Sequence, residues 1–278
     1  MSLAHIPLVD LSHGGPMPQL GLGTWPLDDD EAEGAVLAAF EVGYRHIDTA
    51  VKYGNETGIG RAVALGGLER DELFITTKLD GEFQGDDRAV VGLEGSLRRL
   101  GLDYVDLLLI HWPLPARGAF VSTWQTFERL LADGLTRAIG VSNFTPGHLA
   151  TLAAETSVVP AVNQVQLSPY TPRWAEREYA VAHDILVQSY SPIGAGGELL
   201  HADQVQELAG KHHRTPAQIV LRWHVQQGLA PVPKSADPTR IASNAQVFDF
   251  ELDSDDMAEL ATLDRGPAAG TDPDVTGH

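Results

Sequence analysis

The chain has 278 residues, of which 43% are hydrophobic and 21% are charged, proportions that are typical of a globular protein. It carries 19 lysines and arginines against 38 aspartates and glutamates, and the resulting net charge of −19 argues against binding to nucleic acid or to anionic membranes. There is no cysteine, which excludes disulfides, thiolate-bound metals and a cysteine nucleophile. Because barrels of this length occur as one unit, we expect residues 1–278 to form a single domain.

The first eleven residues do not resemble a secretory signal. They lack a basic start, and His5, Pro7 and Asp10 interrupt the stretch that would have to be apolar. No apolar run approaches the ~18 residues that a membrane-spanning helix requires. We therefore expect a cytoplasmic protein.

The first predicted elements are two short extended segments, 6–11 and 17–20, on either side of His13-Gly14-Gly15-Pro16. This pattern is typical of a β-hairpin, and we expect the hairpin to close the N-terminal end of the fold. Eight short runs rich in Val, Ile and Leu follow: Leu20–Gly23, Tyr44–Asp48, Leu73–Lys78, Val105–His111, Arg137–Ser142, Ala161–Gln164, Ile185–Tyr190 and Ala230–Pro233. They do not alternate polar and apolar residues, which indicates parallel strands buried on both faces.

Helical segments with clear start signals separate these runs. Acidic residues 28–31 suit the positive end of a helix dipole, and Thr145-Pro146 and Thr215-Pro216 each place a capping hydroxyl before a first-turn proline. Eight strands, each followed by a helix, predict an α/β fold, specifically a (β/α)8 TIM barrel.

An open doubly wound sheet is the alternative architecture. That fold usually carries G-x-G-x-x-G after its first strand. Here Gly21-Leu22-Gly23 is followed by Thr24-Trp25-Pro26, so the third glycine is missing. The sequence therefore favours the barrel.

Polar residues stand at the carboxyl end of every predicted strand: Thr24, Asp48, Lys78, His111, Ser142-Asn143, Gln164, Tyr190 and Lys234. In a (β/α)8 barrel these strand ends form the face that carries the active site. We therefore expect these side chains to converge on one site.

Asp48, Lys78 and His111, together with Tyr53, make a chemically coherent set. A tyrosine hydroxyl has a pKa of about 10, and a neighbouring ammonium lowers that pKa while a carboxylate keeps the ammonium charged. The imidazole supplies a neutral donor that orients a carbonyl oxygen. Such a site protonates an alkoxide, and the hydride must come from a cofactor.

Each of these residues alone has an ordinary structural explanation. Asp48 could cap the next helix, Tyr53 could be a half-buried tyrosine, Lys78 a solvated strand end and His111 a core histidine. Their joint appearance, one strand after another, favours a functional site.

Nine stretches across residues 20–252 carry a family pattern: Gly43–Ala50, Tyr53–Glu56, Thr76–Leu79, Leu109–Pro113, Ile139–Phe144, Asn163–Val165, Ser189–Pro192, Pro233–Ser235 and Arg240–Asn244. Any one of them is a weak signal, but as an ordered set the chain resembles the aldo-keto reductases. These are NADPH-dependent enzymes on a (β/α)8 barrel, and the likeness is to the prokaryotic type.

The resemblance implies that Asp48, Tyr53, Lys78 and His111 are the catalytic tetrad, with Tyr53 as the proton donor. It implies a cofactor site for NADPH at Thr24, Ser142, Asn143, Gln164, Tyr190, Ser191, Lys234, Ser235, Arg240 and Asn244. Amides and a hydroxyl in this set would hold the nicotinamide carboxamide, Tyr190 would stack on its ring, and the cations would bind the 2′-phosphate. The implied substrate wall is Trp25, Val51, Phe83 and Trp112.

The expected function is therefore NADPH-dependent reduction of a small-molecule aldehyde or ketone to the alcohol. The alternative is a barrel that binds NADPH for redox sensing with little turnover. Asp237 lies three residues after Lys234, near the expected 2′-phosphate, so use of NADH is also possible. We expect a monomer, with a dimer as the alternative. The other histidines show no metal-ligand spacing, and we expect no metal site and assign these histidines no role.

Overall fold

The computed structural model describes residues 3–194 and 197–277 and places eight parallel strands in one sheet. In spatial order they are β3 (Leu22–Gly23), β4 (His46–Asp48), β5 (Phe74–Leu79), β6 (Val105–Ile110), β7 (Thr136–Ser142), β8 (Val162–Gln166), β9 (Leu186–Tyr190) and β10 (Ala230–Pro231). Each strand pairs with the next one in the chain, as the eight apolar runs predicted.

The sheet closes on itself between its first and last strands. Gly23 forms a parallel bridge with Lys234, and the amides of Gly21 and Gly23 donate to the carbonyls of Pro231 and Pro233, both at 3.1 Å. A Cβ on Gly23 would lie 2.7 Å from the Val232 carbonyl oxygen, so this close approach requires glycine. The predicted barrel is confirmed, and the open sheet was the wrong alternative.

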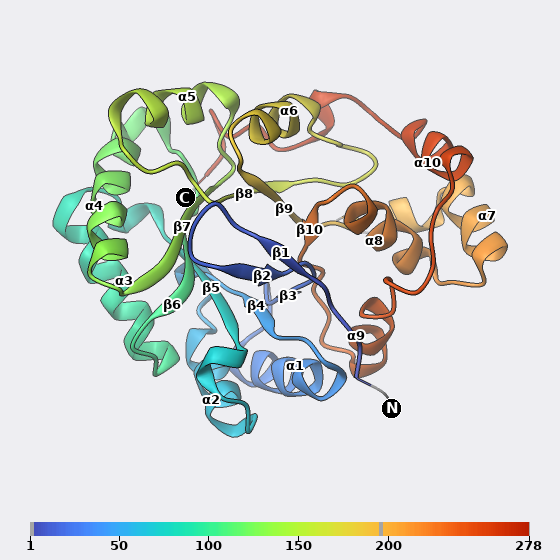
Figure 1. Cartoon of the computed structure of the whole chain (residues 1–278), viewed down its shortest axis with the longest axis horizontal. Helices are drawn as coiled ribbons and strands as arrows, with labels where there is room; N and C mark the ends of the chain where they lie inside the picture. Colours follow the sequence, from blue (N-terminus) through green and yellow to red (C-terminus); the bar gives the residue numbers. More distant parts are fainter. Residues whose placement is uncertain (1–2, 195–196, 278) are drawn as a thin grey trace.

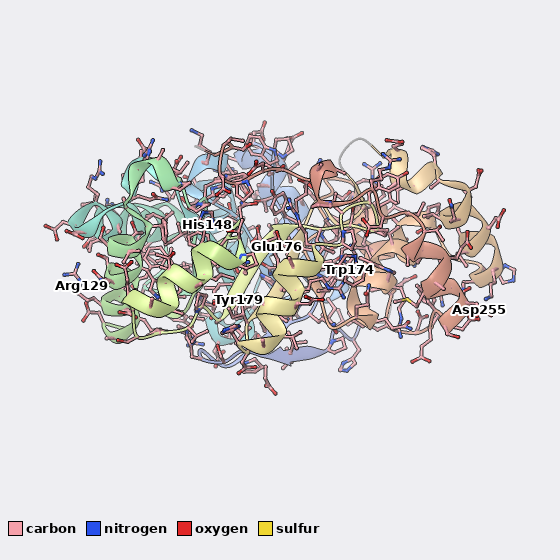
Figure 2. All side chains as sticks on the ribbon, turned by 90° about the horizontal axis from the view of Figure 1, so that it is seen from above. Arg129, His148, Trp174, Glu176, Tyr179 and Asp255 are labelled. Carbon is pink, nitrogen blue, oxygen red and sulfur yellow. The ribbon has the colours of Figure 1, made fainter. Side chains whose placement is uncertain are left out.

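Helices surround the barrel (Figure 1). They are α1 (Asp29–Val42), α2 (Glu56–Leu65), α3 (Asp86–Leu100), α4 (Phe120–Ala132), α5 (Pro146–Glu155), α6 (Trp174–Ala182), α7 (Asp203–His212), α8 (Pro216–Gln226), α9 (Pro238–Asn244) and α10 (Ser254–Ala261). Figure 2 shows α5 with His148 beside α6 with Trp174, Glu176 and Tyr179 on one side of the molecule. The apolar faces of the surrounding helices pack on the strands and form the main core.

The predicted helix starts are confirmed at the level of single hydrogen bonds. Asp28, Thr145 and Thr215 are N-caps, each with a reciprocal capping box to the third helical residue, and prolines follow the two threonines. Each such cap contributes about 0.5–2 kcal/mol.

The hairpin of β1 (Leu8–Asp10) and β2 (Pro16–Pro18) lies across the ring of strands (Figure 1). Met17 is fully buried against residues of the inner barrel, and the Ile139 amide lies 3.2 Å from His13 Nε2. The hairpin thus covers the N-terminal end of the barrel, as predicted, and does not cover the carboxyl ends of the strands. In the described part of the chain no helix has the length and apolar character to cross a membrane.

Candidate active site

A cavity of about 770 Å³ opens at the carboxyl ends of the barrel strands. This size suits a small-molecule or cofactor site. Twelve of the eighteen residues that the sequence predicts for the site line it: Thr24, Trp25, Asp48, Tyr53, His111, Trp112, Ser142, Asn143, Gln164, Tyr190, Ser191 and Lys234. The chain therefore brings together residues from seven strands and their loops.

The other predicted residues lie outside this lining. Lys78 is fully buried and contacts the cavity residues Asp48 and Tyr53. Val51 and Phe83, which were expected in the substrate wall, are not among the residues that line the cavity, and Phe83 packs against the main core. Ser235, Arg240 and Asn244 follow Lys234 in the loop and helix after β10.

Lys78 is the centre of a compact buried cluster. Its ammonium donates to Asp48 Oδ1 at 2.5 Å, to the Thr49 carbonyl at 2.9 Å and to the Tyr53 hydroxyl at 3.2 Å. These three bonds match the three donors of an ammonium, so the charge is compensated and fully hydrogen-bonded. β4 and β5 pair in register, with Asp48 ending one and Lys78 near the end of the other, which brings the two side chains together.

The cluster perturbs the pKa values of both of its weak acids. Burial by itself lowers the pKa of Lys78, but the Asp48 carboxylate and Tyr53 raise it, and the net shift is upward. Burial raises the pKa of Tyr53, and the neighbouring Lys78 only partly reverses this rise. The sequence predicted the lowering effect of Lys78 correctly, but the burial that outweighs it is a property of the tertiary structure.

Tyr53 is placed by the short 3-10 turn η1 (Val51–Tyr53), which follows β4 and ends at Gly54. Its ring lies between two others, with centroids 5.3 Å from Trp25 and 5.7 Å from His111. The phenol, the imidazole and the ring of Trp25 thus lie next to one another in the cavity lining, so that a hydroxyl able to donate a proton stands beside an apolar surface.

A network of amides connects this end of the cavity to Tyr190. Asn143, whose φ is 64°, donates to the His111 carbonyl and to Ser142 Oγ, both at 3.0 Å, and accepts from the Tyr190 hydroxyl at 2.8 Å. Gln164 donates to Asp48 Oδ2 at 2.7 Å and to a neighbouring glutamine. The side-chain N–H donors of Asn143 and Gln164 are therefore all engaged in hydrogen bonds. Among the described residues of this network, the Ser142 hydroxyl and Gln164 Oε1 remain available to a ligand.

The loop and helix after β10 carry the predicted phosphate-binding cations. Arg240 Nε donates to Ser235 Oγ at 3.3 Å, and Lys234 is exposed and lines the cavity. Asp237 is the N-cap of α9 and accepts from the Thr239 and Arg240 amides, which lower its pKa. This carboxylate lies 3.8 Å from the Arg240 guanidinium, so one anion is fixed beside the cationic pair.

The C-terminal segment is held across the same face of the barrel. Gln166 Oε1 accepts from the Thr271 amide and hydroxyl at 2.9 and 2.6 Å, and Arg173 donates to the Thr271 carbonyl at 2.7 Å. Further along, Asp274 lies 3.0 Å from His148 of α5, and Gly277 packs against Trp112. The segment therefore borders the cavity wall near Trp112.

Two buried residues support the site although sequence reasoning assigned them no role. Gln188 is fully buried, and its Oε1 accepts from Gln164 at 2.5 Å. His224 of α8 is also fully buried, and its ring nitrogens lie 3.1 Å from Ser189 Oγ and from the Pro192 carbonyl, on either side of Tyr190. A polar residue inside the apolar run of β9 was a signal for Gln188, whereas nothing in the helix sequence distinguishes His224.

Comparison with known proteins defines the class. A sequence model described as the Aldo/keto reductase family matches residues 19–265. 2,5-diketo-D-gluconic acid reductase B of Corynebacterium sp. (strain SHS752001) is 47% identical over 273 residues, 98% of this chain and 99% of that protein. Methylglyoxal reductase DkgA of Escherichia coli (strain K12) is 44% identical over 278 residues, with 99% and 100% coverage. This chain belongs to the aldo-keto reductase family.

Solved structures agree with this assignment. A Gox0644 mutant crystallised in complex with NADPH superposes with a TM-score of 0.93 at 40% identity, covering 99% of this chain and 100% of that one. The protein is accordingly an oxidoreductase that acts between carbonyl and alcohol groups.

Proposed function

We propose that this protein is an NADPH-dependent carbonyl reductase that converts small aldehydes and ketones to alcohols, with Tyr53 as the proton donor. The observation that carries the proposal is the contact of the buried Asp48–Lys78 ion pair with Tyr53, which lines the cavity beside His111. The relatives named as reductases of methylglyoxal and of diketogluconic acid support small carbonyl compounds as the substrate class. We also propose that the whole chain, 1–278, works as one domain.

The donor set of the cavity fits the proposed cofactor. The Ser142 hydroxyl and Gln164 Oε1 offer one donor and one acceptor, as a carboxamide requires, and Tyr190 presents an aromatic ring nearby. Lys234 and Arg240 supply cations for a phosphate. When bound, NADPH supplies the hydride that the carbonyl carbon accepts.

The remaining steps belong to the protein. Tyr53 holds its proton in the resting state, because burial raises its pKa, and it donates that proton to the oxygen as negative charge develops there. Lys78 stabilises the phenolate left behind, and Asp48 keeps Lys78 charged. His111, whose ring lies edge-on to that of Tyr53, orients the carbonyl oxygen.

Steady-state oxidation of NADPH with a panel of aldehydes tests the proposal. Tyr53→Phe should lower kcat by about 10²–10⁴-fold, the usual contribution of a positioned general acid. NADPH binding, measured by quenching of tryptophan fluorescence, should persist in this variant. Tyr179→Phe, on the outer helix α6, is the matched control and should retain kcat. The proposal fails if no carbonyl supports oxidation above background, or if Tyr53→Phe keeps full activity.

A further inference from the structure

One cation at the cavity has no part in the mechanism described above. Lys52 precedes Tyr53 in η1 and lines the same cavity. Its side chain is 49% exposed, so the ammonium is accessible to a molecule in the cavity. The chain has only four lysines in a protein of net charge −19, and this one lines the cavity proposed for the substrate.

The other two lysines near the cavity already have partners or a proposed ligand. Lys78 is fully buried and uses its three donors on Asp48, Thr49 and Tyr53. Lys234, next to Ser235 and Arg240, belongs to the proposed phosphate site. Among the described residues that line the cavity, Lys52 is thus the cation that remains for the substrate.

The ion pair with Asp80 does not occupy the hydrogen-bond donors of the Lys52 ammonium. Lys52 Nζ lies 3.7 Å from Asp80 Oδ2, beyond the 2.7–3.2 Å of an N–H···O hydrogen bond. No described residue accepts a hydrogen bond from this ammonium within that range, so its donors point to solvent or the cavity. Because partly exposed ion pairs contribute little, an incoming carboxylate can compete for the ammonium. The flexible stem of lysine also lets the ammonium follow such a ligand.

We propose that Lys52 is a specificity-determining residue that favours carbonyl substrates bearing a carboxylate over neutral substrates of the same shape. This inference rests on the proposed reductase function. The aromatic rings of Trp25 and Trp112 contact the apolar part of the substrate, Tyr53 protonates the carbonyl oxygen, and Lys52 attracts the anionic end.

The experiment compares 4-formylbenzoate with its methyl ester, two aldehydes that differ mainly in charge. The measured quantity is the ratio of kcat/KM for the acid to kcat/KM for the ester, with NADPH in both cases. Lys52→Met should lower this ratio about fivefold, the scale of a partly exposed ion pair. Lys52→Arg, which keeps the charge, should hold the ratio near that of the wild type.

Two further measurements separate charge from shape. Asp80→Asn removes the anion that competes for Lys52 and should raise the ratio. Raising the ionic strength from about 0.01 M to about 1 M should lower the ratio in the wild type, because salt screens exposed charges, but not in Lys52→Met.

The outcomes distinguish the two levels of the proposal. If both aldehydes are reduced and Lys52→Met leaves the ratio unchanged, the role of Lys52 is overturned while the reductase function stands. If neither aldehyde nor any other carbonyl is reduced, the proposed function itself fails. Melting temperatures of the Lys52 variants, expected near that of the wild type for this half-exposed side chain, and of the variant at the buried Asp80 show that the ratios refer to folded protein.

Discussion

Gln164 donates a hydrogen bond to Asp48 Oδ2 at 2.7 Å, while Lys78 donates to the other carboxylate oxygen at 2.5 Å. Asp48 is therefore held on both oxygens by groups from two different strands, β8 and β5. The proposed ligand of the nicotinamide carboxamide and the proposed proton-donating cluster share this carboxylate. A substitution of Gln164 should therefore affect the cluster of Asp48, Lys78 and Tyr53.

Gln164→Met tests this connection. It leaves Asp48 Oδ2 buried without its amide donor, which should lower the free energy of unfolding by about 1–3 kcal/mol in urea denaturation. Gln188→Met is the matched control, since it keeps the bond to Asp48 and removes only the neutral contacts with Gln164 and with Met17 Sδ, with an expected loss of about 0.5–1.5 kcal/mol. Equal stability of Gln164→Met and the wild type would contradict the coupling.

Lys78→Met tests how the buried charge is compensated. The substitution leaves the Asp48 carboxylate without its partner and should reduce the free energy of unfolding by about 3–5 kcal/mol. The double variant Asp48→Asn with Lys78→Met removes both charges and should recover part of that loss. If the double variant is less stable than the sum of the two single effects predicts, the ion pair is not the source of the stability.

Asp237→Asn tests the influence of charge on the choice between NADPH and NADH. Asparagine caps a helix about as well as aspartate, so α9 should be retained while the anion beside Arg240 is removed. NADPH should then bind several-fold more tightly in fluorescence titrations, and NADH should be little affected.

Adding a negative charge to the proposed phosphate site should have the opposite effect to Asp237→Asn. Lys234→Glu should weaken NADPH binding by at least about tenfold, because a repulsive carboxylate replaces an attractive ammonium. Lys211→Glu, on α7 and paired with Asp253 and Asp256, should leave NADPH binding unchanged. An unaltered dissociation constant in Lys234→Glu would remove the proposed phosphate site.

His224→Phe tests the contribution of buried histidines to stability in acid. Burial lowers the pKa of His224 to about 3, whereas an unfolded histidine titrates near 6.5. Below about pH 6.5 the unfolded chain therefore binds more protons, and stability falls by at most about 1.4 kcal/mol per pH unit for this group, down to the folded pKa.

The measurement is urea denaturation at about pH 7.5 and about pH 5. The wild type should lose stability between these values, and His224→Phe should lose less, although it starts from a lower level because its bonds to Ser189 and Pro192 are gone. The variant keeps a share of the decline, since His46 is also buried, with a pKa lowered to about 4. An identical decline in both proteins would show that His224 is protonated in the folded state.

Local sequence patterns were sufficient to predict much of the fold. The non-alternating apolar runs predicted eight buried strands, and Thr145-Pro146 and Thr215-Pro216 predicted helix starts, because both signals depend on neighbours in the chain. Bounds were less accurate: the run at 230–233 yields a strand of only two residues, Ala230–Pro231. Strand length depends on ladder partners that the run itself does not contain.

Part of the candidate site could likewise be predicted from the sequence, and part could not. The residue types at the strand ends were sufficient to predict a cluster around Tyr53, since the carboxyl ends of barrel strands meet on one face. Val51 and Phe83 were expected in the substrate wall, but their positions depend on how η1 and the following loop pack. Gln188 and His224 were missed because their partners come from other elements of the barrel.

The sequence by itself determined the order of strands and helices, the residue types of the proposed catalytic site, and the scarcity of cations in an acidic chain. Only the tertiary structure decided which oxygen of Asp48 meets Lys78 and which meets Gln164, and that burial outweighs Lys78 in raising the pKa of Tyr53. The reason is physical: composition and periodicity report local preference, whereas desolvation and hydrogen-bond geometry depend on groups that are distant in the chain, such as Asp48 and Gln164, which are 116 residues apart and meet only in the folded barrel.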